Sequence, residues 1–74
     1  MKYKNTILSI EDEIATAIMN NAPMYDLHLS DGGVIGVQLP KPQTCGTHWQ
    51  QLTYARMKAQ QIMDFIRLFD EKVD

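Results

Sequence analysis

The sequence has little cysteine and no long uninterrupted apolar run. Cys45 is the one cysteine among 74 residues, so the chain has no internal disulfide. Only His28 and His48 could join it as strong zinc ligands, which leaves such a site without its usual fourth ligand. The apolar residues near the N-terminus are interrupted by Glu11 well before they reach the length of a signal-peptide core or a membrane span. These absences favour a protein of the reducing cytoplasm that uses no metal or other cofactor.

Excess charge of one sign is also lacking. Seven lysines and arginines stand against nine aspartates and glutamates, which gives a net charge of -2. Such a chain has no general attraction to phosphate backbones or to anionic lipid. Its basic residues are scattered along the sequence and form no stripe on one helix face. We therefore expect no membrane partner and consider nucleic acid an unlikely one, with a small dimeric nucleic-acid-binding regulator as the alternative function.

A chain of this size can build only a small core. Residues 1–74 make a single domain, and 45% of them are hydrophobic, which is enough for a folded protein. The burial available to so short a chain roughly balances its loss of conformational entropy. Small domains gain the missing stability from disulfides, a metal or a second copy of themselves. With the first two disfavoured, the sequence predicts a homodimer.

Residues 47–73 form the most regular stretch and predict a long amphipathic helix. Thr47 and Gln50 match a capping box, in which the two side chains satisfy free amide groups of the first turn. Apolar residues then recur at alternating spacings of three and four, as one face of a helix requires. This apolar face consists of Leu52, Ala55, Ala59, Ile62, Ile66, Phe69 and Val73.

A first helix is predicted near the N-terminus, because apolar positions from Tyr3 to Ala17 also recur every three or four residues. Its start is open between two alternatives. Asn5 caps it early, or Ser9 caps it later, in which case residues 2–8 form an additional edge strand. The helix ends before Pro23, which lacks an amide donor and disfavours helical geometry at the preceding residue.

Residues 24–39 predict a β-hairpin with an apolar and a polar face. A two-residue turn would place the apolar side chains of the two strands on opposite faces, so we expect a three-residue Asp31-Gly32-Gly33 loop, with Gly33 left-handed at a bulge. The expected pairs are Leu29 with Ile35, Leu27 with Val37, and Tyr25 with Leu39. The polar face carries Asp26, His28 and Gln38. Helix, hairpin and long helix together predict a small α+β domain.

The apolar arc of the long helix is wider than one internal contact needs. One interpretation is that the first helix and the hairpin cover both of its sides. The other, which we favour, is that one stripe packs internally and a second meets a partner, because exposed patches of large apolar residues mark interfaces. The predicted protein interface consists of Tyr54, Met57, Phe65 and Leu68.

Cys45 is the most reactive-looking residue, because it lies close to a helix start and to His48. Catalysis would also need an oxyanion site and a substrate cleft, for which a chain this short has little room. We therefore interpret Cys45 as a structural residue and predict no catalytic residues. The predicted function is a small cytoplasmic, non-catalytic protein-binding module that acts as a homodimer, in the manner of an adaptor, modulator or inhibitor.

Overall fold

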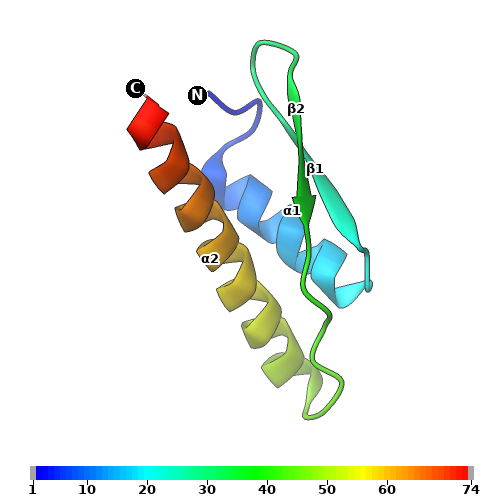
Figure 1. Cartoon of the computed structure of the whole chain (residues 1–74). Helices are drawn as coiled ribbons and strands as arrows, with labels where there is room; N and C mark the ends of the chain where they lie inside the picture. The colour runs from blue at the N-terminus through cyan, green and yellow to red at the C-terminus, as the bar shows by residue number, and fades with distance from the viewer. Residues whose placement is uncertain (1, 74) are drawn as a thin grey trace.

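The computed structural model describes residues 2–73, with side chains described up to residue 68. Its elements are α1 (Ile7–Met19), β1 (Met24–His28), β2 (Val34–Gln38) and α2 (His48–Val73), arranged as in Figure 1. A helix, a two-stranded antiparallel hairpin and a long second helix form a small α+β domain, which confirms the predicted fold class. The predicted apolar positions Phe69 and Val73 lie outside the described side chains.

Helix α1 begins at neither of the two predicted caps. Thr6 is the N-cap, with an extended backbone, and its Oγ1 accepts a hydrogen bond from the Ser9 N–H at 3.2 Å. Asn5 therefore lies before the cap and Ser9 within the first turn. All three residue types are good caps, so the local sequence did not distinguish them.

The predicted N-terminal edge strand is reduced to a single bridge. Tyr3 pairs antiparallel with Leu29. Lys4 donates its N–H to the His28 carbonyl, and the Ser30 N–H donates to the Lys2 carbonyl, both at 3.0 Å. Residues 2–4 thus pair with β1 and the start of the turn, immediately before α1 begins.

The end of α1 follows the predicted position, before Pro23. Asn21 adopts a left-handed conformation, with φ of 59°. Its N–H bonds the Ile18 carbonyl at 3.0 Å, and the Ala22 N–H bonds the Ala17 carbonyl at 2.9 Å. These two bonds are those of a Schellman motif, which satisfies the last carbonyls of a helix.

The hairpin has a three-residue loop, but not the predicted one. Gly32 takes the left-handed conformation, with φ of 93°, and its N–H closes the turn on the Leu29 carbonyl at 3.1 Å. The Asp31 carboxylate accepts the Gly33 N–H at 2.9 Å, which holds the loop Ser30-Asp31-Gly32 in place.

This loop moves the strand register by two residues. The predicted pairs Leu29–Ile35, Leu27–Val37 and Tyr25–Leu39 are wrong, and the observed pairs include Leu27–Ile35 and Tyr25–Val37. A shift of two leaves every side chain on its predicted face, because side chains alternate with a period of two. Asp26, His28 and Gln38 are accordingly exposed.

Helix α2 begins with the predicted capping box. The Gln50 N–H donates to Thr47 Oγ1 at 3.2 Å, and the Thr47 N–H donates to Gln50 Oε1 at 2.9 Å. Gly46 precedes them with φ of 96°, and a Cβ at this position would collide with Gln50 Oε1. A glycine is therefore needed both for the backbone conformation and for the space that the capping side chain occupies.

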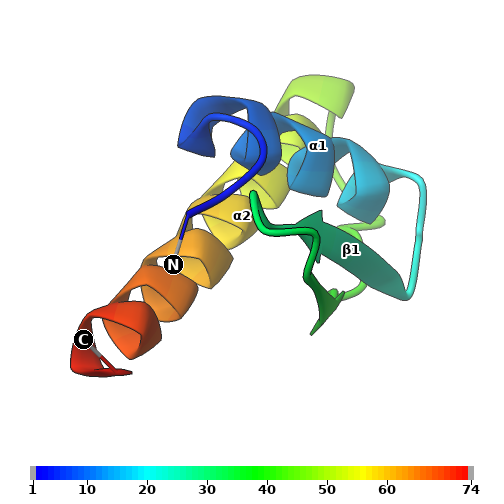
Figure 2. The same cartoon turned by 90° about the horizontal axis from the view of Figure 1, so that it is seen from above.

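The core lies where α1 crosses α2 over one face of the hairpin. Its fully buried members are Ile10, Ile14, Ala15, Ile18, Leu27, Ala55, Ala59 and Met63. Ala55 and Ala59 permit close approach of the two helices, whereas Ile62 and Ile66 of the predicted face are only partly buried. Helix α2 has 26 residues, and its C-terminal part extends past the other elements (Figure 2).

Candidate protein-binding surface

An open groove separates β2 from the side of α2 that faces it. Its volume is about 400 Å³. Residues of β2 and α2 line it: Ile35, Gly36, Val37, Gln38, Lys58, Gln61, Ile62, Phe65 and Ile66. We call this site the α2–β2 groove. Its lining is largely apolar, as in sites that bind apolar side chains.

Phe65 gives the groove its most exposed apolar surface. Its side chain is 71% exposed, whereas Met63, two residues earlier on α2, is completely buried. The neighbouring Ile62 and Ile66 pack only partly against the core. Protein interfaces are enriched in aromatic residues, so an exposed aromatic residue beside half-buried aliphatic ones makes this groove a candidate binding surface.

The edge of β2 beside the groove is paired on one side only, with β1, among residues 2–73. Leu39 donates its N–H to the Pro23 carbonyl at 3.0 Å, so its backbone groups point toward β1. Successive residues of a strand alternate in this direction. The N–H and C=O groups of Val34, Gly36 and Gln38 therefore point away from β1, toward the open edge.

The edge of β1 is protected in a way that the edge of β2 is not. Residues 2–4 cover it at the turn end, and two of these residues are lysines. Lysines at a sheet edge discourage pairing with a further strand. The β2 sequence Val-Ile-Gly-Val-Gln contains neither a proline nor a charged residue that could discourage such pairing.

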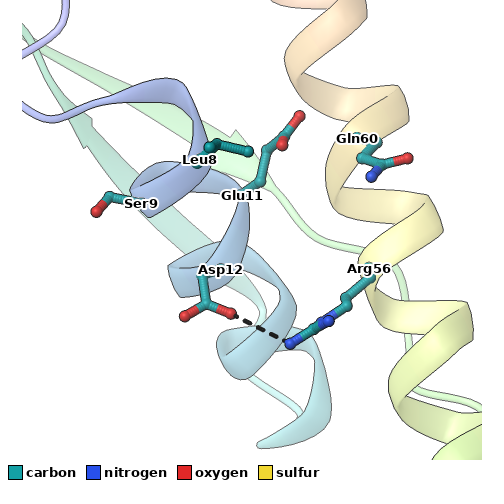
Figure 3. A pocket seen from close by; sticks show the side chains of 6 residues that line it. All are labelled: Leu8, Ser9, Glu11, Asp12, Arg56 and Gln60. Carbon is teal, nitrogen blue, oxygen red and sulfur yellow. Dashed lines mark ion pairs between the residues drawn. The ribbon is translucent and has the colours of Figure 1, made fainter.

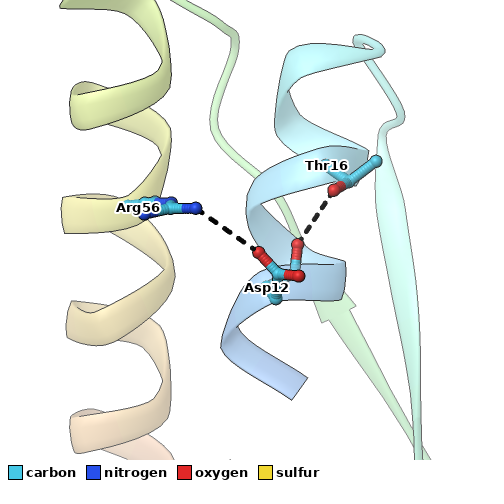
Figure 4. A network of polar contacts seen from close by, with 3 residues as sticks. All are labelled: Asp12, Thr16 and Arg56. Carbon is cyan, nitrogen blue, oxygen red and sulfur yellow. Dashed lines mark hydrogen bonds and ion pairs between the residues drawn. The ribbon is translucent and has the colours of Figure 1, made fainter. Parts of the chain in front are cut away.

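A second hollow, between α1 and α2, is lined mostly by polar and charged residues (Figure 3). Its volume is about 390 Å³, and its lining consists of Leu8, Ser9, Glu11, Asp12, Arg56 and Gln60. Arg56 lies 3.9 Å from the Asp12 carboxylate, and the Thr16 hydroxyl donates to the Asp12 backbone carbonyl at 3.0 Å (Figure 4). Both side chains of the ion pair are mostly exposed, so the pair links the helices only weakly.

A polar contact attaches the hairpin to α1. The Tyr25 hydroxyl donates to Glu13 Oε2 at 2.8 Å. Partial burial, the hydrogen bond to Glu13 and the charge of that carboxylate together raise the pKa of Tyr25 to about 12. The phenol therefore stays protonated and continues to donate to a higher pH than a free tyrosine would.

The residues considered for chemistry do not come together. Cys45 is exposed, with its Sγ 4.0 Å from Thr44 Oγ1. His28 is exposed on the hairpin and His48 at the start of α2. Among the described residues, no three histidine, cysteine or acidic side chains are grouped so that they could hold a metal ion.

The predicted interface residues lie along one side of α2, spread from residue 54 to residue 68, because their spacings bring them within about a quarter turn of one another. Phe65 lines the α2–β2 groove, and Leu68 is 54% exposed. Tyr54 is partly buried, with the Lys58 Nζ 5.5 Å from the centre of its ring. Met57 lines a separate hollow together with Trp49, which is 69% exposed.

Sequence reasoning missed the β2 half of the groove. Ile35 and Val37 were expected only as part of the apolar core, and both are partly buried there. The available signal was that β2, unlike β1, has no charged residue on either face.

Within the described part of the chain, no helix has the length and apolar character needed to cross a membrane. Comparison of the sequence and the fold with protein-family models, with curated proteins and with solved structures finds no match.

Proposed function

We propose that this chain is a small, non-catalytic, cytoplasmic protein that acts by binding other protein chains, and that it functions as a homodimer. Adaptor, modulator and inhibitor are the roles that such a module can fill. The α2–β2 groove carries the proposal, because it combines an apolar lining, a 71% exposed Phe65 and a strand edge with backbone groups free to pair. Protein partners satisfy all three features at once, with side chains for the groove and a strand for the edge.

The test compares two apolar-to-acidic substitutions on exposed side chains. Phe65→Asp places a carboxylate in the groove, whereas Leu8→Asp places one on a residue of α1 that is 80% exposed and lies outside the groove. Both proteins should keep the far-ultraviolet circular dichroism of the unchanged chain, because neither side chain is in the core.

Each immobilised protein is then used to capture partners from a lysate of the native host, and its mass in solution is measured by light scattering. We expect the unchanged chain and Leu8→Asp to associate with themselves or to retain the same specific protein, and Phe65→Asp to lose both properties. Equal behaviour of the two variants, or a monomer that retains nothing specific, would contradict the proposal.

A further inference from the structure

The open edge of β2 has the form of a surface that pairs with itself. Its outward residues Val34, Gly36 and Gln38 are spaced symmetrically about Gly36. A second copy of β2 running antiparallel therefore meets it with Gly36 opposite Gly36 and Val34 opposite Gln38. Each of these facing pairs exchanges two N–H···O hydrogen bonds, so every outward backbone group of the strand finds a partner.

The absence of charged side chains on β2 permits this pairing. The β2 sequence contains no charged side chain, so two copies bring no like charges together. Lys58, a charged residue of the groove lining, lies over the ring of Tyr54. Natural edge strands that stay unpaired usually carry a lysine, a proline or a bulge, and residues 34–38 of β2 have none of these.

The same pairing also covers the groove. Antiparallel strands of one sheet are related by a two-fold axis perpendicular to that sheet, so both copies of α2 lie on the same face of the joined sheet. Helix α2 lies beside β2 across the groove, so the second α2 is brought next to the first, above the joined strands. Phe65 of each copy then faces the other copy across the axis.

We infer that two copies of this chain pair through β2, antiparallel about Gly36, to form a continuous four-stranded sheet order β1-β2-β2-β1, and that this contact closes the α2–β2 groove. The inference rests on the proposed function and deepens it by naming the partner and the register. It separates the β2 edge, which associates, from the β1 edge, which residues 2–4 cover at its turn end.

The test uses charge pairs that face each other only in this dimer. Val34 and Gln38 are both exposed, and within one chain Val34 pairs with His28 and Gln38 with Met24. The double variant Val34→Lys with Gln38→Lys places lysine opposite lysine twice across the interface. The matched control, Val34→Glu with Gln38→Lys, changes the same two positions but places opposite charges in each facing pair.

Sedimentation equilibrium of both double variants and of the unchanged chain gives their dimer dissociation constants. We expect the two-lysine variant to dimerise about tenfold more weakly than its control at low salt, because directly opposed like charges destabilise a sheet. The difference should shrink as salt is added. Circular dichroism checks that both variants are folded.

Two other outcomes would overturn the inference, and they bear differently on the proposed function. If the chain is a dimer that Phe65→Asp dissociates, but the two double variants dimerise equally well, then the β2 register is wrong and the protein-binding proposal stands. If the unchanged chain is monomeric at every concentration, then β2 pairing is wrong, and the protein-binding proposal depends on the capture experiment alone.

Discussion

Two regions of α2 are covered differently by the rest of the chain. Where α2 meets α1, Ala55, Ala59 and Met63 are completely buried. Where α2 faces β2, Ile62 and Ile66 continue the same apolar face toward the C-terminus but are only half-buried, and the flanking Phe65 is 71% exposed. The first region is closed by direct contact between helices, and the second remains an open groove.

The difference follows from side-chain size and from what each neighbour can supply. Alanines on α2 let α1 approach closely, so the large side chains of α1, such as Ile14, fill the space between the helices. At the groove, β2 supplies only two apolar side chains, Ile35 and Val37, with Gly36 between them. One apolar helix face can therefore be fully buried where small residues admit a neighbouring helix and stay partly open farther along.

The largest expected effect compares one isoleucine from each region. Ile14→Ala should lower the free energy of unfolding by about 2–5 kcal/mol, because Ile14 is completely buried and the smaller side chain leaves a cavity. Ile35→Ala should cost only about 1 kcal/mol at low protein concentration, because Ile35 is partly exposed in the single chain. Urea unfolding followed by circular dichroism measures both.

If the two substitutions lower the free energy of unfolding equally in dilute solution, then the groove region is packed as tightly as the region that meets α1. If the loss caused by Ile35→Ala grows with protein concentration, then association covers the groove, because association stabilises the folded state by mass action.

The elements that the sequence predicted well depend on neighbouring residues. The capping box at Thr47 and Gln50 involves residues three apart, so its geometry is set once the helix forms. The polar face of the hairpin was also predicted, because alternation along a strand survives any register shift of two.

The features that the sequence did not predict depend on choices between equivalent local signals or on packing. Two adjacent glycines offered two three-residue loops, and the turn bond from Gly32 to Leu29 decided between them. Met63 was left out of the predicted apolar face, because the line along which α1 crosses α2 determines which α2 positions are buried. Of the predicted interface, Phe65 lies in the groove, but its β2 wall required the three-dimensional structure.

A second prediction concerns how the hairpin is attached to α1 rather than to α2. The pKa of Tyr25 is raised from 10.0 to about 12, with burial as the largest cause and the hydrogen bond to Glu13 as the next. Because the folded-state pKa is the higher one, the stability that protonated Tyr25 contributes is complete below pH 10 and is lost as the pH rises toward 12.

Difference absorbance titration near 295 nm, comparing the unchanged chain with Tyr25→Phe, isolates the Tyr25 phenol. Glu13→Gln should move its pKa part of the way back toward 10, since the carboxylate charge is removed but the burial remains. An unchanged pKa in Glu13→Gln would mean that the hydrogen bond does not hold the hairpin to α1 in solution.

The smallest expected effect is at the polar hollow between α1 and α2. Arg56→Ala removes the ion pair with Asp12, whose N···O distance is 3.9 Å and whose side chains are 58% and 73% exposed. Exposed pairs of this length are screened by water and salt, so the free energy of unfolding should change by less than about 0.5 kcal/mol. A double-mutant cycle with Asp12→Ala, at low and at high salt, measures the coupling. A large coupling that persists in high salt would show that charge, and not the close packing of Ala55 and Ala59 against α1, closes this region of the helix.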